Sequence, residues 1–372
     1  MELPSYFEDF LPLISPTKRQ REVMVTENRR LRELLMGDEQ LKAVLLSTFI
    51  QGSHRRATAI QGDKNHPCDV DVVAVTNIPR SPATAEHAHR VFQPFLERHY
   101  KGKYEAQDRS WCITVDPEVK LDLVPTSEPE SKELREAVIA KSLRDWDPDG
   151  GFGIRKAIGV QTLTEAALEE ARRDKDWEKS EPLWIPDKTL RTWEKTHPLF
   201  LIGWTADKNL QCNGHFGHVV KVLKWWRRHM QPTPKYPKGY PMEHIIAECC
   251  PNGIKSVAAG VCSTLDEIVR RYAQDAAARR TPFLPARGVT DPLINVLHRV
   301  TGEDFAGFYE KVRNASELAR QALNHDNVRE SALLWGKLFG PVFPKPPEDK
   351  TKVSVGYTQP SAPARPQEGR FA

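Results

Sequence analysis

Residues 49–75 read FIQGSHRRATAIQGDKNHPCDVDVVAV. The closing DVDVVAV has the apolar, β-branched composition of a buried strand, yet it contains Asp69 and Asp71. Because side chains alternate between the two faces of a strand, both carboxylates point to one face while Val70 and Val72 enter the core behind them. Two adjacent carboxylates repel each other, so the arrangement favours a site in which a cation lies between them.

A third carboxylate, Asp122, lies in the alternating segment KLDLV. If this segment pairs with the strand that holds Asp69 and Asp71, three carboxylates converge, and three carboxylates can hold two metal ions about 3.5–4 Å apart. Mg²⁺ is the expected ion, with Mn²⁺ as a substitute, because it prefers oxygen ligands and often binds carboxylates together with substrate phosphates. One ion would activate an attacking hydroxyl, and the other would bind a triphosphate and its leaving group.

Gly52 and Ser53 add a candidate phosphate contact. Glycine lets backbone N–H groups approach a phosphate closely, and the serine hydroxyl can donate a hydrogen bond to it. A lone DxD or Gly-Ser pair is most often a solvated loop feature. The order of an apolar strand, Gly-Ser, a strand with DxD and a third strand aspartate about fifty residues later is far more restrictive, and it favours the metal site. Arg55 and Arg56 fit either a phosphate contact or an exposed loop.

The composition narrows the class of protein. The 372 residues carry 54 basic and 50 acidic side chains, a formal net charge of +4, which is too even for a protein that binds bulk DNA or RNA. No stretch approaches the ~20 apolar residues that span a bilayer, and the acidic N-terminus lacks the basic segment of a secretory signal. The six cysteines form no CxxC motif, which favours reduced thiols. We therefore expect a cytoplasmic protein that does not bind membranes.

Helix and strand signals organise the first part of the chain. A helix is expected over residues 17–36, with Thr17 and Gln20 as a capping box and Gly37 at its end. Strands are expected over residues 41–51, 69–76, 110–115 and 119–125, and a helix kinked at Pro94 is expected over residues 82–100.

The second half is mainly helical. An apolar stripe at helical spacing runs along residues 216–230 and includes Trp226, which is expected in the core. Lys221, Lys224 and Arg228 fall on another face of the same helix. Trp225 lies nearer to this basic face, and a further helix is expected to begin at Thr301.

Two segments carry little periodic pattern. Residues 146–197 are rich in charge, Trp, Gly and Pro and are expected to form a connector of poorly defined structure. Residues 345–372 are polar and proline-rich, so they cannot bury enough apolar area to offset ordering, and a disordered tail is expected.

The motifs QGSHRRATAI, DVDVVAV and VKLDLVPT resemble those of the polymerase-β-like nucleotidyltransferases. The first is similar to the GSxRxxTAI version found in bacterial CD-NTases, which are relatives of cyclic GMP-AMP synthase and oligoadenylate synthase. FGHVVKVLKWW resembles the core helix of the family, whose lysine, here Lys224, reaches the triphosphate. PKYPKGYPMEHII resembles the element whose aromatic residue, here Tyr240, stacks on a base; Gly239 replaces the serine common before it. ALLWGKLFGPVFP and the final GRFA resemble clade D members.

This resemblance implies a two-lobed α/β (α+β) fold of the polymerase-β-like type. A mixed-sheet catalytic lobe with an N-terminal helix would cover residues 1–145, and a helical C-terminal lobe would cover residues 198–344. The implied catalytic and metal-binding residues are Asp69, Asp71 and Asp122. The implied nucleotide-binding residues are Gln51, Gly52, Ser53, Lys224 and Tyr240.

The resemblance also implies an activity and partners. Clade D relatives join ATP, with or without GTP, into a cyclic trinucleotide (cyclic AMP-AMP-GMP or cyclic AMP-AMP-AMP) that acts as a second messenger in CBASS antiphage defence. Regulators in such systems include ubiquitin-transfer-like enzymes and HORMA-type proteins. A flexible tail that ends at Ala372 could reach the active site of a ubiquitin-transfer-like enzyme for conjugation.

Three alternatives stay open at this point. A linear nucleotidyltransferase that acts on RNA or protein would carry the same carboxylates, although the near-neutral charge argues mildly against RNA. A catalytically silent nucleotide sensor is disfavoured by the presence of all three carboxylates. A zinc site formed by His244, Cys249, Cys250 and Cys262 is disfavoured by their spacing, and IIAECC fits a buried helix better.

Overall fold

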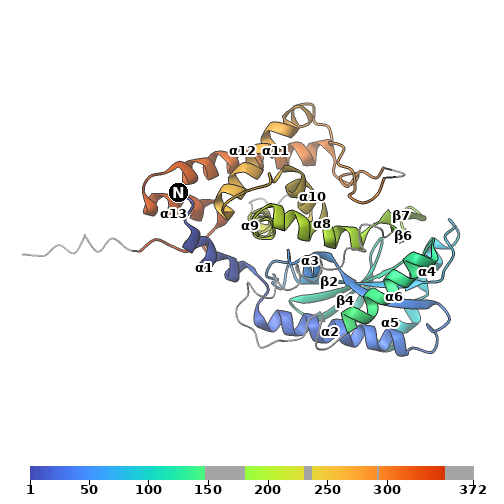
Figure 1. Ribbon diagram of the computed structural model, residues 1–372. Helices are drawn as coiled ribbons and strands as arrows, with labels where there is room; N and C mark the ends of the chain where they lie inside the picture. The colour runs from blue at the N-terminus through green and yellow to red at the C-terminus, as the bar shows by residue number, and fades with distance from the viewer. Residues whose placement is uncertain (147–180, 230–236, 291–292, 348–372) are drawn as a thin grey trace, which may run out of the picture.

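The computed structural model describes residues 1–146, 181–229, 237–290 and 293–347, which form two lobes (Figure 1). One lobe is built on a five-stranded mixed sheet and the other is made of helices. The two-lobed α/β fold expected from the sequence is thereby confirmed. No helix in the described ranges is both long and apolar enough to span a membrane.

The sheet lobe contains α2 (Lys18–Gly37), β1 (Leu45–Gln51), α3 (Gly52–Arg55), β2 (Cys68–Thr76), α4 (Ala85–Arg90), α5 (Gln93–His99), β3 (Tyr104–Ala106), β4 (Trp111–Asp116), β5 (Val119–Pro125) and α6 (Lys132–Trp146). A separate hairpin is formed by β6 (Leu183–Asp187) and β7 (Thr192–Thr196). The helical lobe contains α1 (Pro4–Ile14), α8 (Pro198–Gln211), α9 (Phe216–His229), α10 (Gly239–Cys249), α11 (Val257–Ala277), α12 (Gly302–Asn324) and α13 (Val328–Phe339).

The two faces of β2 have different roles. The strand order is β1-β2-β5-β4-β3, in which β2 and β5 are parallel and the other neighbours are antiparallel. Val70 and Val72 are buried on one face, in a cluster with Leu31 of α2. Val73 and Val75 are buried on the other face, in a cluster that includes residues of α6. The two aspartates of β2 occupy the beginning of this second face and line a cavity instead.

The N-terminal helix α1 packs into the helical lobe. The ring centroid of Phe7 lies 5.3 Å from that of Trp335 and 5.9 Å from that of Phe339. Phe10 is fully buried in the same cluster. The expected grouping of residues 1–145 in one lobe is therefore corrected for α1, because its apolar face is complementary to the aromatic face of α13 rather than to the sheet.

Part of the expected connector is an ordered hairpin. β6 and β7 pair antiparallel, so the expectation of poorly defined structure is wrong for residues 183–196, while residues 147–180 lie outside the described residues. Asp187 at the end of β6 is fully buried and accepts a hydrogen bond from Arg299 of the helical lobe at 2.8 Å. The hairpin thus links the two lobes.

Most of the other local expectations are confirmed. Thr17 and Gln20 form the capping box of α2, and the Thr301 side chain caps α12. The helix expected over residues 82–100 is instead divided into α4 and α5. Pro94 lies in the first turn of α5, where its missing N–H leaves no helical hydrogen bond unmade.

Two side chains of α9 are more buried than the helical pattern predicts. Trp225 is buried, and its Nε1 donates to the Phe339 carbonyl at 3.1 Å. Lys221 is buried too, with Nζ 3.4 Å from Ser15 Oγ, and burial lowers the pKa of its ammonium group to about 8. The reason is that α9 packs against α1 and α13 as well as against α8, α10 and α11. Trp226 is buried as expected.

Candidate active site

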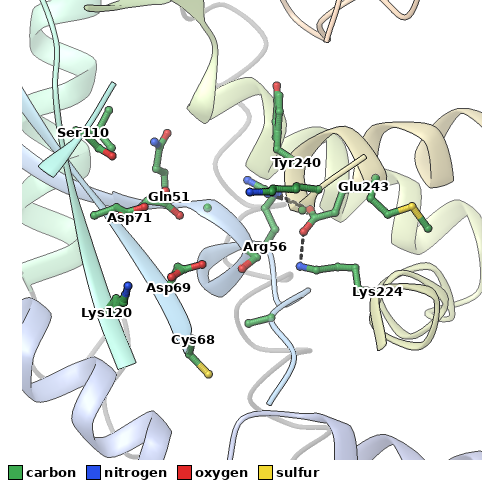
Figure 2. A pocket seen from close by; sticks show the side chains of 18 of the residues that line it. Gln51, Arg56, Cys68, Asp69, Asp71, Ser110, Lys120, Lys224, Tyr240 and Glu243 are labelled. Carbon is green, nitrogen blue, oxygen red and sulfur yellow. Dashed lines mark hydrogen bonds and ion pairs between the residues drawn. The ribbon is translucent and has the colours of Figure 1, made fainter. Parts of the chain in front are cut away.

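Three carboxylates come together on neighbouring strands. In the parallel pairing of β2 with β5, Asp71 lies in register with Asp122, and Asp69 lies in register with Lys120. All three aspartates line one cavity of about 840 Å³ between the sheet and the helical lobe. Figure 2 shows Asp69 and Asp71 on β2, facing Arg56 and the helical lobe across the pocket.

Burial and mutual repulsion perturb these carboxylates. Burial, together with the charges of Asp71 and Asp69, raises the pKa of Asp122 to about 8. Burial and the Asp69 charge raise the pKa of Asp71 to about 6, and burial also raises the pKa of Asp69. Asp122 Oδ1 is buried and has no hydrogen-bond partner within the described parts of the chain. A nearby cation would relieve all of these penalties.

The donor set fits a divalent ion whose coordination a substrate completes. Among the described residues, no group of three or more His, Cys, Asp or Glu side chains is arranged to hold a metal ion unaided. Mg²⁺ often binds through one or two carboxylates and takes its other ligands from substrate phosphates and water. The unpartnered oxygen of Asp122 and the raised pKa values of the three aspartates match this mode of binding.

Gly52, the first residue of α3, lies in close contact with the Asp71 side chain. Its φ is +81°, a left-handed conformation that favours glycine. A Cβ atom at this position would lie 1.7 Å from Asp71 Oδ2. Glycine is therefore required here both by the backbone and by the carboxylate. Gln51, which pairs with Asp71 across β1 and β2, and Ser53 both line the cavity.

Positive side chains face the carboxylates from the opposite wall. Arg56, in the segment after α3, and Lys224, on α9, both line the cavity and both bind Glu243 of α10 (Figure 2). Lys224 Nζ donates to Glu243 Oε1 at 2.7 Å and to the Thr58 carbonyl at 3.0 Å. Lys224 thus reaches the cavity, in an ion pair that the sequence did not suggest.

Tyr240 lies at the beginning of α10, directly after Gly239, and both residues line the cavity. The Tyr240 side chain is 38% exposed, and its ring centroid lies 4.4 Å from that of His244. One side of the ring is therefore supported by the protein while the residue stays accessible from the cavity. This arrangement suits stacking of a nucleobase.

Glu243 is the site residue that sequence reasoning missed. It is only 8% exposed, and its neighbours Met242 and His244 are buried as well. A carboxylate within an apolar helix has to be paired, because an unpaired buried charge is very costly. The sequence PMEHII, in which Glu243 lies among apolar residues, would have been enough to predict a buried, paired carboxylate. Ala372, expected to serve in conjugation, lies outside the described residues.

The His and Cys residues considered for zinc have separate partners. His244 Nε2 accepts from the Arg287 backbone N–H at 3.4 Å, and Cys262 Sγ lies 3.9 Å from Asp266 Oδ2. All six cysteines are free and buried, and the second half of α10, including Ile245, Ile246 and Cys249, is largely buried, as the IIAECC pattern predicts.

Comparisons with known proteins agree on the class of fold and chemistry. The family described as "Second Messenger Oligonucleotide or Dinucleotide Synthetase domain" (SMODS) matches residues 1–146. A cyclic AMP-AMP-GMP synthase of Enterobacter hormaechei subsp. hoffmannii (strain UCI 50) is 40% identical over 395 residues, covering all of both chains. A probable cyclic AMP-AMP-GMP nucleotide synthase of Salmonella paratyphi B is 40% identical over 394 residues, again covering all of both chains.

A solved structure extends the similarity to the fold of both lobes. The Bradyrhizobium diazoefficiens CD-NTase CdnG in complex with GTP superposes with a TM-score of 0.63 at 11% identity, covering 91% of this chain and 95% of that one. At this identity the likeness concerns the fold alone, whereas the full-length 40% identity to the synthases establishes kinship. The chain belongs to the CD-NTase family and is a nucleotidyltransferase.

Proposed function

We propose that this nucleotidyltransferase joins ATP and GTP into a cyclic trinucleotide of two adenylates and one guanylate. The observation that carries the chemistry is the cavity in which three carboxylates of β2 and β5 face Arg56 and Lys224. The choice of product is supported by the full-length 40% identity to a cyclic AMP-AMP-GMP synthase. A cyclic AMP-AMP-AMP product stays the alternative within the same chemistry.

Each residue then has a distinct role in the proposed reaction. Asp69 and Asp71 would hold Mg²⁺, or Mn²⁺, against the donor triphosphate, and Asp122 would complete the site beside the acceptor hydroxyl. When bound, the two ions would lower the pKa of that hydroxyl and stabilise the departing pyrophosphate. Every step forms one phosphodiester bond and releases one pyrophosphate, and the last step is an intramolecular attack that closes the ring.

The other lining residues would hold the nucleotide. The Gly52 backbone and the Ser53 hydroxyl would contact phosphate, with Gln51 beside them. Lys224 would neutralise phosphate charge. Tyr240 would stack on a base. Because stacking does not distinguish one base from another, other side chains that line the cavity would determine which base is bound.

Product analysis tests this proposal. The protein is incubated with ATP, GTP, CTP, UTP and Mg²⁺, and the mixture is then treated with phosphatase. The nucleotide products that resist phosphatase are identified by mass spectrometry. A cyclic product has no terminal phosphate and survives, so we expect one species with two adenylates and one guanylate. A product that phosphatase converts to a linear oligonucleoside, or nucleotide attached to RNA or protein, would contradict the proposal. Asp71→Asn is the matched inactive control, because it keeps the size of the side chain.

We further propose that the product is a second messenger in CBASS antiphage defence. A role for the tail in conjugation by a ubiquitin-transfer-like enzyme, and regulation by a HORMA-type protein, are predictions of the same kind. Substitution of Ala372 should abolish conjugation by the transferase while pyrophosphate release is unchanged. Unaltered conjugation of the variant would remove the proposed role of the tail.

A further inference from the structure

Glu243 forms a buried bridge between the two lobes. It extends from α10 of the helical lobe, and its Oε2 accepts from Arg56 of the sheet lobe, from Nη2 at 2.9 Å and from Nε at 3.3 Å. Its Oε1 accepts from Lys224 Nζ at 2.7 Å and from Thr58 Oγ1 at 3.1 Å. Figure 2 shows Arg56 and Lys224 converging on Glu243 beside the cavity.

The bridge keeps Glu243 ionised. Burial alone would favour its neutral form, but the charges of Lys224 and Arg56 outweigh burial and hold the pKa of Glu243 at about 2. Both of its oxygens are occupied by donors, so Glu243 itself is neither a free metal ligand nor a free base. What it can do is hold the two cations that touch it.

The two cations keep donors for a ligand. A lysine ammonium has three N–H donors, and Lys224 uses two of them, on Glu243 and on the Thr58 carbonyl. A guanidinium has five N–H donors, and Arg56 places only its Nε and Nη2 on Glu243. Lys224 and Arg56 both line the cavity that contains the three aspartates. The remaining donors are therefore fixed next to the place where a triphosphate would lie.

We propose that Glu243 is a positioning residue that fixes Arg56 and Lys224 in the pose that receives the nucleotide triphosphate. The inference rests on the nucleotidyl-transfer site proposed above. Donors that are fixed before the substrate arrives do not have to be reorganised during the reaction. Because Arg56 and Thr58 belong to one lobe and Lys224 to the other, the same carboxylate also sets the spacing of the two lobes at the phosphate end of the cavity.

The test measures pyrophosphate release, which reports nucleotidyl transfer whatever the final product is. In Glu243→Gln the side-chain amide still has an acceptor but offers no charge, and its NH₂ group opposes one of the two cations. We expect kcat/KM for nucleotide to fall about 10–100-fold, the effect typical of losing a residue that orients a ligand. Glu243→Asp keeps the charge and should recover part of the loss.

A matched control separates positioning from stability. Glu248→Gln makes the same change on the same helix and removes ion pairs with Arg271 and Arg287, at 2.7 and 2.8 Å. Neither Glu248 nor these two arginines line the cavity. We expect Glu248→Gln to lower the unfolding temperature while kcat/KM stays within about twofold of the wild type, as is usual for changes outside a site.

A double-mutant cycle with Lys224→Met is decisive. If Glu243 acts by holding its cationic partners, then Glu243→Gln should cost clearly less in the Lys224→Met background than in the wild type. Equal losses in both backgrounds, wild-type kcat/KM in Glu243→Gln, or an equal fall in Glu248→Gln would each overturn the proposal. A product other than a cyclic trinucleotide, with the cycle as expected, would overturn only the proposed function.

Discussion

Asp71 on β2 and Asp122 on β5 occupy the same register position on two parallel, adjacent strands. Burial and the Asp69 charge raise the pKa of Asp71 to about 6, and burial with the charges of Asp71 and Asp69 raises the pKa of Asp122 to about 8. At neutral pH the metal-free site therefore holds a proton that a divalent cation would have to displace. This competition underlies the first two predictions.

Asp122→Asn should abolish nucleotidyl transfer and stabilise the metal-free protein. The substitution removes one carboxylate from the proposed metal site, a loss of several kcal/mol that corresponds to about 10²–10⁴-fold in rate. It also removes a buried charge that is unfavourable at pH 8.5 in EDTA, so the unfolding temperature should rise by several degrees. Pyrophosphate release and thermal unfolding measure the two effects. Asp116→Asn, at an exposed ion pair with Arg19, is the control; a variant with normal turnover would remove Asp122 from the site.

In EDTA, the stability of the wild type relative to that of Asp122→Asn should fall as the pH rises from about 4 to about 8. The folded-state pKa of Asp122 lies above its unfolded value, so the native state binds more protons than the unfolded state in this window. Lys120 and Cys112 face Asp122 and lower its pKa only in part. Chemical denaturation over this pH range measures the slope, and Mg²⁺ should bind more tightly as the pH rises. A Mg²⁺ affinity that is independent of pH would contradict the prediction.

Gly52→Ala should eliminate activity through its contact with Asp71. The new Cβ would meet Asp71 Oδ2 at 1.7 Å, so the carboxylate must move out of its place in the cavity. Gly102→Ala is the control, because Gly102 has a similar φ of +70° and nothing within 4 Å of its Cβ position. Both variants should lose stability to backbone strain, about 1–3 kcal/mol, while only Gly52→Ala loses pyrophosphate release. Equal activity of the two variants would show that the Asp71 pose is unimportant.

Tyr240→Ala should weaken nucleotide binding more than it slows chemistry. Stacking of a base on an aromatic ring is worth about 1–3 kcal/mol, so KM should rise about 5- to 150-fold with a smaller change in kcat. Tyr240→Phe keeps the ring and should retain a nearly normal KM. If Tyr240→Phe were as impaired as Tyr240→Ala, the hydroxyl rather than the ring would be the functional group.

The convergence of the three carboxylates was predictable because it depends on local geometry. Alternation along a strand puts Asp69 and Asp71 on one face whatever the rest of the chain does. The position of Asp122 needed one further assumption, that β5 is the neighbour of β2, and the parallel pairing supplies it. Gly52 was predicted to lie near a phosphate group. Its close approach to Asp71 was not predicted, because it depends on how the end of β1 and the beginning of α3 pack against β2.

The burial and the partners of some residues were predicted wrongly or not at all, because they depend on packing between segments that are far apart in the sequence. Lys221 and Trp225 lie off the apolar stripe of α9, but Ser15 and Phe339 reach them from the two ends of the described chain. The hairpin of β6 and β7 was missed because Pro186 lies inside β6, and a proline weakens any strand signal. Glu243 was missed for a related reason, since its partner Arg56 lies far away in the sequence.

Anomalous diffraction from crystals soaked with Mn²⁺ and a non-hydrolysable ATP analogue tests the central claim most directly. We expect manganese peaks within coordination distance of Asp69, Asp71 and Asp122, about 2.0–2.2 Å for a hard oxygen ligand, with the triphosphate extending toward Ser53 and Lys224. Metal bound elsewhere, or a triphosphate that does not contact the aspartate-bound ions, would contradict the claim that these three carboxylates carry out nucleotidyl transfer.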